Sequence, residues 1–191
     1  MKIQLKKVTL GIFLGGALIL CNALLAQSVY DAMKEQVKGL YTSFRASVAI
    51  TSSSGQITTG KIMYQYPGKL RLETATGIIA TNGTHLWIHN KASAICARQD
   101  VSGVSGGLLG VLSRYEGVAQ GGSFVFKKPG AYYDEIIVQA AGGMIRSVKL
   151  KHDEESTTYS FSNVQIDTGI SGAMFNYKPS GAQIIENPLN Q

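Results

Sequence analysis

Apolar and polar residues alternate along most of the chain between residues 44 and 90, and this pattern constrains the fold more than any other. In the segment FRASVAI, every second residue is apolar: Phe44, Ala46, Val48 and Ile50. The segments 57–66 and 69–73 continue the same alternation. Successive side chains of a β-strand point to opposite faces of the sheet, whereas a helix requires a period of 3.6 residues. The pattern therefore predicts consecutive strands, each with one apolar face.

Turn signals separate these strands. They are the polar segment 52–56, the pair Pro67-Gly68 and the pair Asn82-Gly83. Proline fixes its own φ and glycine tolerates a positive φ, so Pro67-Gly68 indicates a bend. An Asn-Gly pair is the strongest short signal for a hairpin. The segment 84–90 is therefore predicted to be a strand that returns antiparallel to residues 77–81.

Two histidines, His85 and His89, flank the single tryptophan Trp87 in this return strand. On a helix, two histidines four residues apart would share a face and could bind zinc. On a strand they also share a face, but they lie about 13 Å apart at roughly 3.3 Å per residue. A shared zinc ion requires Zn–N distances of about 2 Å. We therefore expect no metal site here and place Leu86 and Ile88 on the opposite face.

The rest of the chain adds four strands and two helices. The strands are predicted at residues 123–128, 133–140, 144–152 and 156–166. The acidic run HDEE at 152–155 falls in a predicted tight turn, where charges are normally solvated. Apolar residues at helical spacing predict a helix within residues 27–44 and a shorter one over 106–117, flanked by glycines. The second helix is interpreted either as a crossover helix packed on the sheet or as a movable lid.

The first 26 residues have the layout of a secretory signal peptide. Three lysines precede an uncharged apolar run at 8–20, and Ala26 is a small residue suited to cleavage. We expect one domain over residues 27–191, located in the periplasm. An uncleaved anchor would need about 20 apolar residues, and Asn22 interrupts the run. A lipidated Cys21 is the other alternative, although Leu20 precedes it where a small residue is usual.

Cleavage changes the charge and the cysteine count. Without the three leader lysines the chain has 18 − 3 = 15 basic and 12 acidic residues, a net charge of +3. No run of basic residues is present, so nucleic acid is not an expected partner. Cys96 would remain alone, which excludes an intramolecular disulfide, and we expect it to be buried and inert. No nucleophile elbow, metal pair or paired-acid arrangement is found, so no catalytic residue, metal or cofactor is predicted and an enzyme is not expected.

About eleven short antiparallel strands with two helices define an α+β chain dominated by one large sheet. Twist accumulates over so many strands, so the sheet must be strongly curved. Two helices, one of them short, are too few to fill the concave side, and an apolar cavity is expected there. By alternation, the inner face carries Phe44, Val48, Ile62, Tyr64, Leu70, Leu72 and Ile79. The alternative is that these residues form a closed, packed core.

Three segments resemble the periplasmic outer-membrane lipoprotein carrier family, the LolA family. They are GKIMYQYPGKLRLET, IIATNGTHLWIHN and, near the end, MFNYKPSGAQII. The family shows a strand before a proline bend, a hairpin of the form DG-x-x-L-W and a late F-x-(F/Y)-x-P-x-G segment. Here these are Asn82-Gly83 with Leu86-Trp87, and 175–179 followed by Gly181. The resemblance spans nearly all of residues 27–191.

The resemblance implies a half-closed β-barrel with a helical lid, acting as a monomeric carrier of acylated lipoproteins. Its implied partners are an inner-membrane ABC-type release complex and an outer-membrane acceptor. Besides the seven inner-face residues, the candidate lipid-binding residues are Tyr66, Leu86, Ile88, Leu108, Leu109 and Leu112.

The sequence departs from the family at the proline bend. Family members carry a lid-latching arginine just before the proline, where this chain has Tyr66. Arg71, on the face opposite Leu70, is a weak substitute. A binding protein for another lipid, such as a glycolipid or phospholipid, is therefore a second hypothesis. A non-transporting envelope module with a filled core is a third.

Overall fold

A single sheet of twelve strands makes up nearly all of the chain that the computed structural model describes, which is residues 31–33, 35–37, 42–102, 112–120, 122–166 and 168–186. The strands are β1 (Ser43–Ser52), β2 (Ile57–Gln65), β3 (Lys69–Thr74), β4 (Gly77–Thr81), β5 (His85–Asn90), β6 (Ile95–Asp100), β7 (Glu116–Gln120), β8 (Ser123–Lys127), β9 (Glu135–Ala141), β10 (Met144–His152), β11 (Glu155–Ile166) and β12 (Gln183–Glu186). A short 3₁₀ helix, η2 (Gly172–Phe175), precedes β12.

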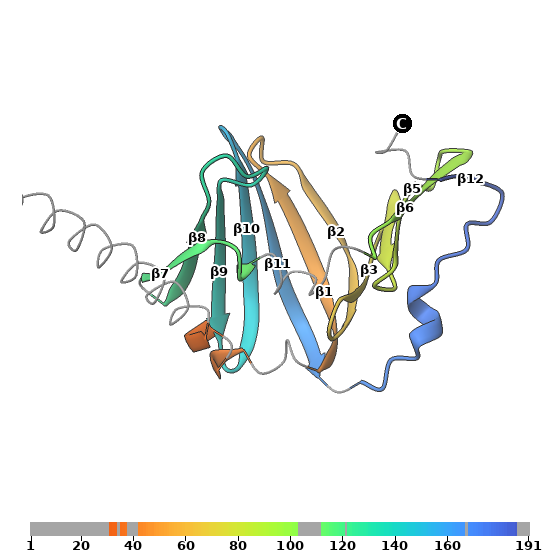
Figure 1. The fold of residues 1–191 in the computed structure, drawn as a ribbon. Helices are drawn as coiled ribbons and strands as arrows, with labels where there is room; N and C mark the ends of the chain where they lie inside the picture. The colour runs from red at the N-terminus through yellow and green to blue at the C-terminus, as the bar shows by residue number, and fades with distance from the viewer. Residues whose placement is uncertain are drawn as a thin grey trace, which may run out of the picture.

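The strands lie in the order β12-β6-β5-β4-β3-β2-β1-β11-β10-β9-β8-β7. Figure 1 shows them turning from β7 on the left to β12 on the right as one open, curved sheet. Almost every neighbouring pair is an antiparallel hairpin, as the turn signals predict. The exceptions in connectivity are the long-range antiparallel pair β1–β11 and the pair β12–β6, which is parallel. The prediction of antiparallel strands alone is therefore wrong for the last strand.

Strands β2 and β3 come unusually close to each other at Gly60. A Cβ atom placed on Gly60 would lie 2.4 Å from the backbone oxygen of Glu73. No real Cβ atom lies that close to another atom. Only glycine at position 60 therefore allows the two strands to approach as they do. Glycine inside a strand often marks such a bend or close approach.

The two faces of the sheet are covered differently. We call the face that carries Phe44, Ile62 and Leu72 the inner face, and the face that carries Arg71 and Trp87 the outer face. On the inner face of β8 and β9, large apolar side chains pack with residues from the segments before β1 and before β7: Met33, Val37, Leu112, Phe124, Phe126, Ile136 and Val138. On the outer face, residues 168–186 run beside β3 to β6 (Figure 1).

The predicted helices are shown only in small part. In the segment 27–44, residues 31–33 and 35–36 are helical, while Ser43 and Phe44 already belong to β1, so the predicted helix is too long at that end. Most of the predicted helix 106–117 lies outside the described residues, but Glu116 and Gly117 begin β7. They pair with Lys127 and Phe126, and these ladder hydrogen bonds replace the predicted helical turn.

The described residues form twelve strands, where about eleven were predicted, and β6 and β7 are two that the alternation did not indicate. The predicted leader, residues 1–26, lies outside the described residues. Within the described residues, no helix combines the length and the apolar character needed to cross a bilayer.

Candidate functional site

A cavity of about 330 Å³ lies on the inner face of the sheet. Strands β5, β4, β3, β2, β1, β11 and β10, which are consecutive in the sheet, supply its wall. The lining residues are Val37, Phe44, Ile62, Tyr64, Gly68, Leu70, Leu72, Ile79, Thr81, Leu86, Met144, Ile145, Val148, Leu150, Tyr159, Phe161 and Val164. None of these residues carries a charge, so the cavity can accommodate apolar matter without separating an ion from water.

The cavity exists because the inner face is filled at one end only. At β8 and β9, Phe126 and Met33 are completely buried, and the core there is closed. Val37 belongs both to that core and to the cavity wall, so it marks the boundary between the two halves. Beyond it, the inner side chains of β2 to β5 face the cavity. The expected apolar cavity is therefore present, beside a packed core.

Among the described lining residues, the polar side-chain groups are three hydroxyls, those of Tyr64, Thr81 and Tyr159. Burial raises the pKa of the Tyr159 phenol above its ordinary value, so this group stays neutral at physiological pH. The polar atoms of the wall can orient a ligand by hydrogen bonds, but they offer no general base or nucleophile. This arrangement suits binding of an apolar chain.

The structure brings together seven of the thirteen predicted lipid-binding residues in the cavity wall: Phe44, Ile62, Tyr64, Leu70, Leu72, Ile79 and Leu86. Val48 and Leu112 are buried in the adjoining core instead. Tyr66 and Ile88 are about half exposed, at 46% and 50%, and do not line the cavity. Leu108 and Leu109 lie outside the described residues. Whether any of these residues contacts lipid stays a prediction.

Sequence reasoning missed the wall that β10 and β11 provide. Val148 and Leu150 of β10, and Tyr159 and Phe161 of β11, alternate with polar residues in the same way as the residues of β1 to β3. That signal was sufficient to place them on one face. It could not show that β11 pairs with β1 and so brings this face into the same cavity, because the pairing joins segments about 110 residues apart.

The outer face of β4 to β6 carries a second, smaller core. It contains Ile78, Ala80, Trp87 and Cys96, with Tyr177 and Ala182 of the C-terminal segment packed on it. Burial raises the pKa of the Cys96 thiol, which fits the expected inert role. The indole nitrogen of Trp87 is buried there without a hydrogen-bond partner.

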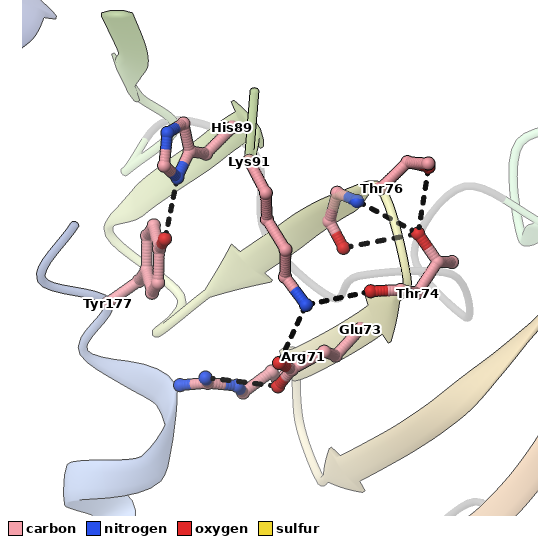
Figure 2. A network of polar contacts seen from close by, with 8 residues as sticks. Arg71, Glu73, Thr74, Thr76, His89, Lys91 and Tyr177 are labelled. Atoms are coloured by element: carbon pink, nitrogen blue, oxygen red, sulfur yellow. Dashed lines mark hydrogen bonds and ion pairs between the residues drawn. The ribbon is translucent and has the colours of Figure 1, made fainter. Parts of the chain in front are cut away.

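His89 lies in this outer core and is only 6% exposed. Its Nδ1 atom lies 2.6 Å from the hydroxyl oxygen of Tyr177 (Figure 2). Its Nε2 atom lies 3.2 Å from the carbonyl oxygen of Ser93. Both ring nitrogens are therefore occupied by protein groups. Among the described residues, no three His, Cys, Asp or Glu side chains gather closely enough to hold a metal ion.

Arg71 also points to the outer face, away from the cavity. Its guanidinium group pairs with Glu73 at 3.2 Å, donates to the backbone oxygen of Met174 at 3.2 Å and lies over the ring of Tyr177. Figure 2 shows Lys91 on the other side of Glu73, and the Lys91 ammonium group is the largest cause of the lowered Glu73 pKa. Arg71 therefore fastens the C-terminal segment to β3 and is not placed to latch a lid over the cavity.

No protein-family model matches the chain, and neither does any curated protein. Solved structures do match. A DUF1329 family protein from Desulfovibrio piger is 11% identical, with a TM-score of 0.50 over 80% of this chain and 98% of that one. The two chains share a fold. A LolA superfamily protein from Nitrosomonas europaea is 10% identical, with a TM-score of 0.49 over 80% and 98% of the two chains.

A third structure, described as an outer membrane lipoprotein-sorting protein domain from Vibrio parahaemolyticus, is 11% identical, with a TM-score of 0.47 over 81% of this chain and 97% of that one. At such identities, the likeness concerns the fold alone. The function that the sequence resemblance implies is a separate question.

Proposed function

We propose that this protein is a periplasmic carrier that buries the acyl chains of lipoproteins in the cavity of its inner face. The observation that carries the proposal is the uncharged lining of a cavity of about 330 Å³. That volume lies within the range of about 300 to 1,000 Å³ found for small-molecule sites, which are mostly apolar with few polar groups.

The energetics of acyl chains explain why such a protein is needed. Each methylene group removed from water contributes about 0.8 kcal/mol, so a sixteen-carbon chain exposed to water costs on the order of 13 kcal/mol. A lipoprotein with several such chains does not diffuse freely between membranes. A carrier must cover these chains in transit and still release them.

The cavity wall suits temporary binding. Leu72 is well buried, whereas Ile79, which pairs with it on β4, is 37% exposed. A chain bound along this wall would gain only part of the burial free energy that a closed core provides. Partial burial limits the affinity and so favours transfer. We propose that the chain is loaded by an inner-membrane ABC-type release complex and unloaded to an outer-membrane acceptor.

The direct test is displacement of a fluorescent fatty acid from the folded protein. The substitution Ile79→Asp introduces a charge into the cavity wall and should weaken binding by about tenfold or more, because burying an unpaired carboxylate is very unfavourable. Ile57→Asp is the matched control, since Ile57 is 65% exposed and does not line the cavity. Failure of the wild-type protein to bind the probe would refute the proposal.

A second candidate function is the binding of another lipid, and the residue at the proline bend favours it. Tyr66 replaces the arginine that the sequence resemblance leads us to expect, and none of the lining residues that the structure describes is charged. Depletion of the protein distinguishes the two functions. Lipoproteins retained in the inner membrane would support the lipoprotein carrier, whereas normal sorting would support the alternative. Mass spectrometry of the natively purified protein would identify the cargo.

A further inference from the structure

An exposed aromatic stack stands at one end of the cavity. The rings of Tyr132 and His152 lie parallel, with centroids 4.3 Å apart and an interplanar angle of 13°. Tyr133 makes an edge-to-face contact with Tyr132 at 4.9 Å. These contacts hold the ring of Tyr132 in place. Tyr132 is nevertheless 70% exposed, more than any other large apolar side chain among the described residues. An oriented ring that faces solvent is a prepared binding surface, because little side-chain freedom remains to be lost.

The stack lies close to the cavity wall. Leu150 lines the cavity, and His152 follows two residues later on the same strand, so their side chains leave the same face about 7 Å apart. Tyr133 packs against the core that adjoins the cavity, and its phenol is close enough to the lining residue Tyr159 for the two to interact electrostatically. A ligand whose chain lies along Leu150 and Tyr159 would therefore present its polar end to this stack.

The loops that form the stack are fixed to each other. Residues 128–134 join β8 to β9, and the backbone N–H of Asp134 donates to the carbonyl oxygen of Lys151 at 3.1 Å. The hydroxyl of Tyr115 donates to the carbonyl oxygen of Tyr133 at 2.9 Å, which anchors the loop from the other side. Figure 1 shows this loop beside the tip of the β10–β11 hairpin. The aromatic surface is thus part of the rigid sheet end.

The electrostatic surroundings of the stack are negative. Asp153, Glu154 and Glu155 at the hairpin tip are exposed, and Asp134 is exposed in the adjoining loop. The nearby Glu135 is neutralised by ion pairs with Lys127 and Lys151 at 3.1 and 2.9 Å. Lys128 is the remaining lysine of the loop, and it lies over the ring of Tyr115. This end of the molecule therefore attracts cations, although the whole chain is basic.

We propose that the Tyr132–His152 stack receives an ammonium group of the ligand whose acyl chain lies in the cavity. The inference rests on the proposed function, since it requires a chain in the cavity. The face of a tyrosine ring is negative and attracts a cation within about 6 Å of its centroid. The carboxylates around it raise the local concentration of cations. The ammonium group belongs either to a phospholipid head group or to a lysine of the acylated polypeptide.

The test compares amphiphiles that share a dodecyl chain and differ in the head group. Binding of dodecyltrimethylammonium, dodecyl maltoside and dodecanoate is measured below their aggregation concentrations by displacement of a fluorescent fatty acid. We expect the ammonium compound to bind about twofold to fivefold more tightly than the maltoside, with a preference that declines as salt is added. Equal binding of all three would overturn this inference and leave the proposed function intact, whereas no binding of any would refute the proposed function itself.

Variants at Tyr132 test whether its ring causes the preference for the ammonium compound. Tyr132→Ala should abolish the preference for the ammonium compound and leave dodecanoate binding unchanged, while Tyr132→Phe, which keeps the ring face, should retain the preference. Ile166→Ala is the control, because Ile166 is 46% exposed and stands at the far end of β11. A preference that survives in Tyr132→Ala would overturn the inference.

Two further ligands identify the source of the ammonium group. Dodecylphosphocholine carries it on a phospholipid-type head group, and an N-dodecanoyl peptide with lysine carries it on a polypeptide. An N-dodecanoyl peptide with norleucine in place of lysine is the neutral reference. The ligand whose binding depends on Tyr132 identifies the source, and dependence of neither on Tyr132 would overturn the proposal.

Discussion

Two isoleucines on the inner face allow its packed half to be compared with its hollow half by measuring stability. Ile136 of β9 is 1% exposed in the packed half, and Ile62 of β2 is 6% exposed in the wall of the cavity. Both lie within strands and both belong to the same connected core. Replacement of each by alanine removes the same atoms from nearly the same degree of burial. Any difference between the two losses of unfolding free energy therefore shows whether packed atoms or a cavity surround the side chain.

The expected magnitudes follow from two contributions. Loss of three methylene-sized groups from a buried position costs about 2.4 kcal/mol at about 0.8 kcal/mol each. In a packed core the substitution also leaves a void of roughly 70 Å³, which adds about 1.7 kcal/mol at roughly 24 cal/mol per Å³. Ile136→Ala should thus destabilise the protein by about 4 kcal/mol. Ile62→Ala enlarges a void that already exists and should cost about 2.5 kcal/mol.

Urea unfolding followed by circular dichroism measures both values, with linear extrapolation of the free energy of unfolding to zero denaturant. Equal slopes with urea concentration in the two variants are the control for unchanged unfolding behaviour. A cost for Ile62→Ala equal to or above that of Ile136→Ala would refute the reasoning. It would mean that Ile62 is surrounded by packed atoms and that no cavity adjoins it in solution.

Three further predictions concern single features of the fold. Gly60→Ala should lower the free energy of unfolding by about 1–3 kcal/mol, since the added methyl group meets the backbone of β3, and an unchanged thermal midpoint would contradict this. Tyr177→Phe should cost about 1–3 kcal/mol in urea unfolding, because the buried ring of His89 loses a partner; a loss near zero would mean that water replaces the hydroxyl. Lys151 is the largest cause of the lowered pKa of Glu135, so this carboxylate stabilises the fold above its ordinary pKa of 4.5, and the stabilisation is lost as the pH falls. Glu135→Gln should therefore flatten the acid side of the stability curve, and an unchanged curve would exclude the carboxylate as its source.

The strands of the first half of the sheet could be predicted because their signals are local. Alternation fixed which residues of β1 to β5 share a face, and seven of the predicted residues do line one cavity. The hairpin at Asn82-Gly83 was predicted from two residues, and Gly83 adopts the positive φ of 94° that such a turn requires. The same alternation predicted that Trp87 and His89 lie on one face of the sheet and Leu86 on the other, as the structure shows.

Other elements could not be predicted because their signals are weak or distant. β7 was missed because Glu116 and Gly117 follow a stretch with helical spacing, and only pairing with β8 selects the strand. β12 runs parallel to β6, a pairing between residues nearly ninety positions apart that no local pattern encodes. His89 was predicted to lie on one face of a strand, but the sequence did not show what covers that face. Tyr177 of the C-terminal segment covers it and buries His89.

The sequence by itself determined where strands form and which side chains share a face, because a period of two and the conformational limits of glycine and proline act over a few residues. The tertiary structure decided which half of the inner face is packed and which remains hollow. It also decided that β10 and β11 complete the cavity wall and that the aromatic stack stands beside it. These outcomes depend on contacts such as those of Met33 with the β8–β9 face and of β1 with β11, which form only when distant parts of the chain meet.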